Sequence, residues 1–167
     1  MLDTNVFNDV LDGKVDIAFV MGKRVVATHI QYDEIGKTRN DDRRAALLKI
    51  FEVISAHQSP TSSSVAGISV AGAACASSGS VVPTESAVFG VSRWGASNWV
   101  GNSDVFSEMR NELNLLNNNK RNNTEDVLIA ETVLKNKWVL VTSDKDLTLV
   151  AQNHGCLCST PTACFSP

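Results

Sequence analysis

The feature that most constrains the fold is an apolar run at residues 138–143, which ends at the carboxylate of Asp144. Its valines, leucine and tryptophan are typical of a buried strand. The start of the chain repeats this order in a shorter form, because Leu2 precedes Asp3 and an apolar helical pattern follows at residues 6–11. A strand that ends at an acid and leads directly into a helix is typical of an α/β sheet. We therefore expect Asp3 and Asp144 at the edge of such a sheet.

Strands and helices alternate along the rest of the chain. Further strands are predicted at residues 24–28 and 156–158. Residues 14–22 fit either a helix or a strand, and we favour a helix because a strand follows directly. Further helices are predicted at about residues 29–35, 41–54, 104–116, 126–134 and 146–153. Since 167 residues suffice for one core, we expect a single α/β domain at residues 1–158 with a mostly parallel sheet, followed by a tail at 159–167.

Residues 53–84 contain no Asp, Glu, Lys or Arg and are rich in Ser, Ala, Gly and Val. This change of composition predicts an insertion at about residues 55–102, folded as a small-residue helix or as a pair of strands. Its small residues and serines are not typical of a membrane span. A surface for a partner or substrate is the alternative, because aromatic side chains can stack on bases, although we expect these to be buried. The residues concerned are Phe89, Arg93, Trp94 and Trp99.

The overall charge is slightly negative, at −3. A chain of this charge has no broad basic field, which argues against indiscriminate coating of nucleic acid but not against a nuclease with local phosphate contacts. The chain does not open with the pattern of a secretory signal, so we expect a cytoplasmic protein that does not enter a membrane. Cysteines 75, 156, 158 and 164 are expected to be ordinary thiols, with a disulfide or a metal site left open.

Two further acids occupy comparable positions. Glu34 lies on the helix that follows the strand at residues 24–28, and Asp126 opens a helix for which Thr124 is the expected N-cap. The carboxyl edge of an open α/β sheet is its ligand-binding crevice. Four carboxylates that meet there repel one another unless a divalent cation neutralises them. The sequence therefore predicts a metal site formed by Glu34, Asp126 and the two strand-end acids.

Each acid also has a purely structural explanation. Asp3 and Asp146 could act as helix caps, and Asp126 could stabilise the N-terminus of its helix. Asp144 could be a turn residue, and Glu34 could be a solvated acid on the surface of its helix. Neighbouring acids are rivals at two positions, because Asp33 is adjacent to Glu34 and Glu125 is adjacent to Asp126. The sequence alone leaves these alternatives open.

Taken in order, four features resemble the PIN-domain ribonucleases and, within them, the VapC-like toxins of bacterial toxin–antitoxin pairs. They are Leu-Asp-Thr-Asn at residues 2–5, an acid on the helix after the second strand, an Asp that opens a later helix, and Val-Thr-Ser-Asp-Lys-Asp-Leu at residues 141–147. The resemblance covers about residues 1–54 and 103–158. It implies a three-layer α/β/α fold and a metal-dependent endoribonuclease that leaves a 5′-phosphate and a 3′-hydroxyl.

The resemblance also implies roles for individual residues. The acidic quartet matches Asp3, Glu34, Asp126 and Asp144. Of these, Asp3, Asp126 and Asp144 are expected to bind Mg²⁺ or Mn²⁺. Supporting roles are expected for Asn5, Thr142 and Asp146. Phosphate contacts are expected from basic residues near the acids, namely Lys37, Arg39, Arg43, Arg44, Lys120 and Arg121. The implied partners are an RNA substrate, a cognate antitoxin protein and a second copy of the chain.

Two other functions compete with this interpretation. A PIN-like binding module for RNA or a protein partner, with weak or absent cleavage, is favoured by the long uncharged insertion and the negative charge. A phosphohydrolase or phospho-acceptor domain needs an Asp-x-Asp pair at the first strand or a functional Lys after a late strand, and this chain has Asn5 in place of the second acid.

Overall fold

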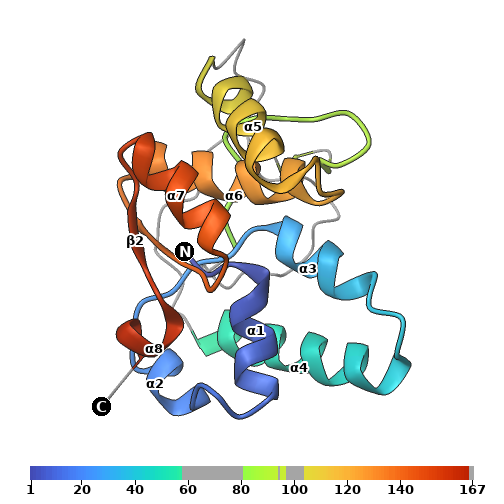
Figure 1. The fold of residues 1–167 in the computed structure, drawn as a ribbon. Helices are drawn as coiled ribbons and strands as arrows, with labels where there is room; N and C mark the ends of the chain where they lie inside the picture. Colours follow the sequence, from blue (N-terminus) through green and yellow to red (C-terminus); the bar gives the residue numbers. More distant parts are fainter. Residues whose placement is uncertain (58–80, 94, 97–103, 166–167) are drawn as a thin grey trace.

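The computed structural model describes residues 1–57, 81–93, 95–96 and 104–165. Its elements are α1 (Thr4–Leu11), α2 (Ile17–Met21), α3 (His29–Gly36), α4 (Asp41–His57), α5 (Asp104–Asn117), α6 (Asn123–Asn136), β1 (Val139–Val141), α7 (Lys145–Asn153), β2 (Leu157–Ser159) and α8 (Pro161–Cys164) (Figure 1). Most of the predicted insertion, with Cys75, Trp94 and Trp99, lies outside the described residues. The short helix α8 was not predicted, and it lies in the segment assigned as a tail.

Parallel pairing joins segments from both ends of the chain. Strands β1 and β2 are parallel, with Val139 opposite Leu157. Single parallel bridges add Leu2 beside Val141 and Ala27 beside Val81. The Leu2 amide donates to the Val26 carbonyl at 2.9 Å and closes the row. Five extended segments therefore lie side by side with the start of the chain in the middle, in a mixed helical fold in which β1 and β2 form a two-stranded parallel sheet.

The extended segments separate two hydrophobic clusters. Met1 and Leu140 pack into one cluster, with side chains of α5, α6 and α7. Leu2 and Val141 pack into the other, with side chains of α1, α2 and α4. Successive residues of a strand point to opposite faces, so this division follows from the two-residue period of the segments. Figure 1 shows α5, α6 and α7 in the upper half of the molecule and α1, α2 and α4 in the lower half.

The ends of two helices differ from the sequence prediction. Helix α6 begins before Thr124, because the side chain of Asn123 is only 2% exposed and is held by hydrogen bonds to two other asparagines. Helix α7 is capped by Asp144, whose Oδ1 accepts hydrogen bonds from the amides of Asp146 and Leu147 at 2.9 and 3.0 Å. The expected start at Asp146 is therefore wrong by one residue.

The segment after the uncharged stretch returns to the body of the protein. The Val82 amide donates to the Ala27 carbonyl at 2.8 Å. Arg93 binds Asp33 and lies over the ring of Tyr32, with 5.6 Å between the guanidinium carbon and the ring centroid. The side chain of Phe89 is fully exposed, so the expectation that it is buried is wrong.

Two composition-based expectations concern membranes and thiols. None of the helices in the described ranges has the length and the apolar character that a bilayer crossing requires. Cys156, Cys158 and Cys164 are free thiols within those ranges, so they form no disulfide with one another.

Candidate active site

The first extended segment ends at Asp3, whose carboxylate is buried and held on both oxygens. Its Oδ1 accepts a hydrogen bond from the Thr4 amide at 2.6 Å, which makes Asp3 the N-cap of α1. Its Oδ2 accepts from the side chains of Asn5 and Thr142, each at 2.6 Å. Asp3 therefore caps α1 and also lies among the other acids. Its capping role does not exclude a role in the site.

A small polar network fixes the loop after β1 against α1. The Thr142 hydroxyl oxygen accepts hydrogen bonds from the Asn5 amide group at 3.1 Å and from the Asp144 amide at 3.0 Å. The Asn5 carbonyl oxygen accepts from the Ser143 amide at 3.2 Å. Asn5 and Thr142, the residues assigned supporting roles, thus connect Asp3 to the segment that carries Asp144.

Helix α3 places Glu34 beside the start of α1. The Thr4 hydroxyl donates a hydrogen bond to Glu34 Oε2. Burial raises the pKa of Glu34 to about 7, the Thr4 hydrogen bond opposes this shift, and the charges of Asp3 and Glu125 add to it. The neighbouring Asp33 binds Arg93 instead, so helix orientation decides between these two acids in favour of Glu34.

Helix α6 contributes Asp126, which is 7% exposed. Burial is the largest cause that raises its pKa to about 9, and the charges of four other acids raise it further. Those acids are Asp3, Glu34, Asp144 and Glu125. Repulsion of this kind falls with distance. The carboxylates predicted from four separate parts of the chain therefore share one environment.

The same environment acts on Asp3. Burial raises the pKa of Asp3 to about 6, against hydrogen bonds from Thr142, Thr4 and Asn5 that lower it, and the charge of Asp144 raises it. Hydrogen-bond donors therefore compensate only part of the cost of burying this negative charge. Such excess negative charge is what a bound cation relieves.

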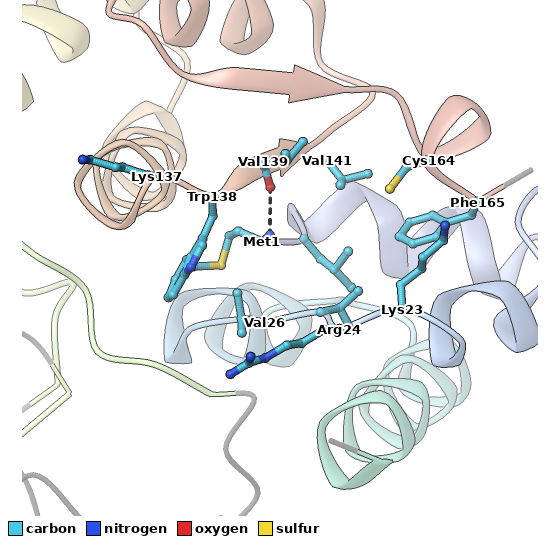
Figure 2. Close-up of a pocket in the computed structure, with 12 residues that line it drawn as sticks. Met1, Lys23, Arg24, Val26, Lys137, Trp138, Val139, Val141, Cys164 and Phe165 are labelled. Carbon is cyan, nitrogen blue, oxygen red and sulfur yellow. Dashed lines mark hydrogen bonds between the residues drawn. The ribbon is translucent and has the colours of Figure 1, made fainter. Parts of the chain in front are cut away.

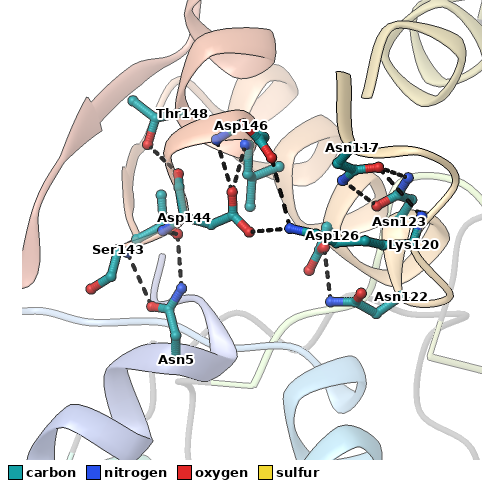
Figure 3. Close-up of polar contacts among 12 residues, drawn as sticks. Asn5, Asn117, Lys120, Asn122, Asn123, Asp126, Ser143, Asp144, Asp146 and Thr148 are labelled. Atoms are coloured by element: carbon teal, nitrogen blue, oxygen red, sulfur yellow. Dashed lines mark hydrogen bonds and ion pairs between the residues drawn. The ribbon is translucent and has the colours of Figure 1, made fainter. Parts of the chain in front are cut away.

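The loop before α6 brings a cation to the outer side of the acids. Lys120 Nζ lies 3.9 Å from Asp144 Oδ2 and 3.7 Å from Asp146 Oδ2. Figure 3 shows the Lys120 side chain reaching toward these two carboxylates, with Asp126 and Asn122 on its other side. Asn122 donates to Asp126 Oδ2 at 3.0 Å.

A pocket of about 310 Å³ adjoins the acids and shares Glu34 with them. Its other lining residues are Lys37, Arg121, Asn122 and Glu125. Lys37 forms an ion pair with Glu125 at 3.2 Å. Two of the basic residues expected to contact phosphate therefore lie beside the acidic site.

The remaining basic residues are engaged elsewhere or exposed. Arg43 binds Asp12 at 2.9 Å, at the end of α1 away from Asp3. Arg44 binds Asp41 at 2.8 Å. Arg39 is exposed and makes no hydrogen bond or ion pair within the described part of the chain.

The fit to a metal ion is good in chemistry but incomplete in geometry. Carboxylate oxygens are the ligands that Mg²⁺ and Mn²⁺ prefer, and the raised pKa values of Asp3, Glu34 and Asp126 indicate uncompensated charge. Among the described residues, however, no three His, Cys, Asp or Glu side chains are arranged to hold one ion as they stand. Coordination by these acids requires their side chains to draw closer together.

A second cavity, of about 560 Å³, lies at the opposite edge of the sheet (Figure 2). Apolar and basic side chains line it, among them Val26, Trp138, Phe165, Lys23, Arg24 and Lys137. The described lining residues include no carboxylate, so this cavity offers nothing that suits a hard cation. Although it is larger than the pocket beside the acids, its chemistry does not match the predicted activity.

Sequence reasoning gave too little weight to three residues of the site. Thr4 binds Glu34, Asn122 binds Asp126, and Glu125 pairs with Lys37 while acting on Asp126 through its charge. Each is next to, or a few residues from, a predicted acid. Sequence proximity was the available signal, but it does not tell which neighbour points inward.

No protein-family model matches the sequence, and the searches of curated proteins and of solved structures returned no match either.

Proposed function

We propose that this protein is a Mg²⁺- or Mn²⁺-dependent endoribonuclease and that its active site is the acidic cluster. The observation that carries the proposal is the mutual repulsion of carboxylates at the N-cap of α1, on α3 and α6, and in the loop after β1. A fold gains no stability from burying like charges together. Perturbed acids in one cleft are therefore candidates for a functional site.

We also propose that the fold is of the three-layer α/β/α PIN type. Two findings support this proposal. The extended segments run in the spatial order 81, 27, 2, 139–141 and 157–159. Hydrophobic clusters lie on both of their faces.

In the proposed reaction, water attacks a phosphorus of RNA, the bond from phosphorus to the 3′-oxygen breaks, and a 5′-phosphate and a 3′-hydroxyl result. A bound divalent cation supplies charge stabilisation at the phosphate and makes the attacking water more acidic. Asp3, Asp126 and Asp144 would provide the oxygens that hold this cation. Glu34, with a pKa of about 7, is suited to accept the proton of the water near neutral pH.

The basic residues beside the acids position the substrate. Lys37 and Arg121 line the adjoining pocket, where they can bind phosphates that flank the scissile bond. Asn122 also lines this pocket and holds Asp126 through a hydrogen bond. Asp146 is partly exposed next to Asp144 and is placed to orient water.

The resemblance leads us to propose further that the protein is a cytoplasmic toxin, that it forms a homodimer and that a cognate antitoxin neutralises it. A toxin of this kind arrests growth when it is expressed alone, and a protein encoded by the adjacent gene relieves the arrest. Arrest that persists with every neighbouring gene co-expressed contradicts the antitoxin part of the proposal.

The nuclease proposal is tested by cleavage of labelled RNA with and without Mn²⁺. We expect cleavage by the wild-type protein to require the metal and to be abolished in Asp126→Asn and Asp3→Asn. Glu52→Gln, at an exposed acid of α4, is the matched control and should cleave normally. Circular dichroism establishes that each variant is folded. Full activity in both Asp variants rules the proposal out.

A second candidate is a PIN-like module that binds RNA or a protein without cleaving it. It is favoured by the observation that no three acids of the described residues are arranged to hold one ion. This candidate predicts RNA or protein binding without uptake of Mn²⁺, which equilibrium dialysis measures directly.

A further inference from the structure

The ion pair between Lys120 and the acidic site is loose. Its ammonium lies 3.7 and 3.9 Å from carboxylate oxygens of Asp146 and Asp144. These distances exceed those of hydrogen bonds, so the contact is ionic without directional bonding. The side chain of Lys120 is also 51% exposed, and exposed ion pairs of this kind are weak. Lys120 thus neutralises the outer acids in part and can be displaced at little cost.

The backbone around Lys120 is held in place. Asn123 is buried, and its amide group donates to Asn114 at 2.6 Å and to Asn117 at 2.8 Å. Asn118 and Asn119 both adopt left-handed conformations, with φ of 57° and 55°. Asparagine tolerates this region better than most residues. The asparagine-rich sequence therefore forms a defined turn that brings Lys120 to the mouth of the site (Figure 3).

We propose that Lys120 is an exchangeable internal cation of this site. Without metal, its ammonium lies against Asp144 and Asp146. A divalent cation held by the carboxylates would take the place of the ammonium, which would then be free to contact a non-bridging oxygen of the RNA phosphate. Lys120 is then a positioning residue for the substrate and a competitor of the metal.

The other nearby cations are less suited to this exchange. Lys37 is paired with Glu125, and Arg121 lines the adjoining pocket without an ion pair to Asp144 or Asp146 in the described structure. Among the described residues, Lys120 is the cation that forms ion pairs with Asp144 and Asp146. This inference rests on the proposed nuclease function, because the exchange requires both a metal and a phosphate.

The test compares wild-type protein with Lys120→Gln, Lys120→Arg and the control Lys49→Gln, which removes the same charge from an exposed position of α4. Calorimetric titration with Mn²⁺ alone, in the absence of RNA, measures the competition. We expect Lys120→Gln to bind Mn²⁺ about two- to fivefold more tightly, the range that corresponds to the loss of an exposed ion pair. Lys120→Arg and Lys49→Gln should match the wild type.

The role at the phosphate is measured with a single-stranded RNA substrate at several salt concentrations. Lys120→Gln should raise KM more than it lowers kcat. It should also make the slope of log(1/KM) against log salt concentration shallower by about 0.7, the value for one phosphate contact on a single strand. Lys120→Arg should restore both quantities, which a merely structural role of the loop would not explain.

The outcomes distinguish failure of the proposed nuclease function from failure of the Lys120 exchange alone. If wild-type protein takes up no Mn²⁺ and cleaves no RNA, the proposed function and this inference both fail. If wild-type protein binds Mn²⁺ and cleaves RNA while Lys120→Gln behaves as Lys49→Gln does in both assays, the exchange alone is wrong. Tighter Mn²⁺ binding together with the shallower salt slope supports it.

Discussion

The two edges of the sheet differ in cavity volume and in buried charge, and the edge with the smaller pocket is the one with the buried acids. The amino edge has a cavity of about 560 Å³ with apolar and basic walls. The carboxyl edge has a pocket of about 310 Å³ beside a group of acids whose pKa values are raised by burial and mutual repulsion. The larger cavity is lined by apolar and basic side chains, whereas the smaller pocket adjoins buried acids whose mutual repulsion disfavours folding. Unfavourable charge, and not cavity volume, is therefore the reason to propose the carboxyl edge as the functional site.

Helix polarity contributes to this separation of charge. At the carboxyl edge, Asp3 and Asp144 cap the N-termini of α1 and α7, where negative charge is favoured. At the amino edge, Lys137 follows the C-terminus of α6 and Lys23 follows that of α2, where positive charge is favoured. Single acids are thus stable at one edge and single cations at the other. The grouping of several buried acids goes beyond what helix dipoles explain.

The strongest test of the difference between the edges is Glu34→Gln. If Glu34 accepts the proton of the attacking water, kcat for RNA cleavage should fall by about 10²- to 10⁴-fold. The folded structure should persist, because glutamine can still accept the hydrogen bond of Thr4. Asp33→Asn is the matched control, since its carboxylate binds Arg93 outside the site, and it should retain wild-type kcat. Equal losses in the two variants would contradict the assignment of Glu34.

A second test uses the pH dependence of stability without metal. The folded-state pKa values of Asp3, Glu34 and Asp126, about 6, 7 and 9, lie above their ordinary values. Between about pH 4 and those values, the folded protein binds more protons than the unfolded chain, so its stability falls as pH rises. We expect the free energy of unfolding to drop between pH 5 and pH 8 by on the order of 1 kcal/mol or more.

Chemical denaturation at the two pH values measures this drop. Asp126→Asn should reduce it, because the amide does not titrate. Mn²⁺ should restore stability more at pH 8 than at pH 5, since protons compete with the metal for the carboxylates. A free energy of unfolding that rises from pH 5 to pH 8 would show that the acids are not mutually destabilised.

The smallest expected effect is at the amino edge. Lys137 adopts a left-handed conformation, with φ of 56°, at the C-cap of α6. Glycine adopts this conformation without a steric penalty, so Lys137→Gly should stabilise the fold by about 0.5–1 kcal/mol. Thermal unfolding measures the gain, and Lys137→Ala should show none. Mn²⁺ affinity and RNA cleavage should be unchanged, and a loss of either would show that the two edges are coupled.

Local sequence patterns determined the types of the elements and their order. The apolar run of the strand at 138–143 and the spacing of apolar residues in the helices are visible without any tertiary information. The acids at 3 and 144 follow strands and precede helices, so their place at the carboxyl edge was predictable from chain order. Supporting roles for Asn5 and Thr142 were expected only from the resemblance, and both side chains donate hydrogen bonds to Asp3.

Only the tertiary structure decided which of two adjacent acids faces the site. Successive residues of a helix are rotated by about 100°, so the packing of α3 turns Glu34 toward Asp3 while Asp33 pairs with Arg93. On α6, Asp126 is buried among the acids, and Glu125 lines the adjoining pocket, where it pairs with Lys37. The burial of Asn123 likewise places the start of α6 before Thr124, which was the expected N-cap. The sequence thus determined which residues can reach the edge of the sheet. Long-range packing, which no local pattern encodes, decided which of them meet.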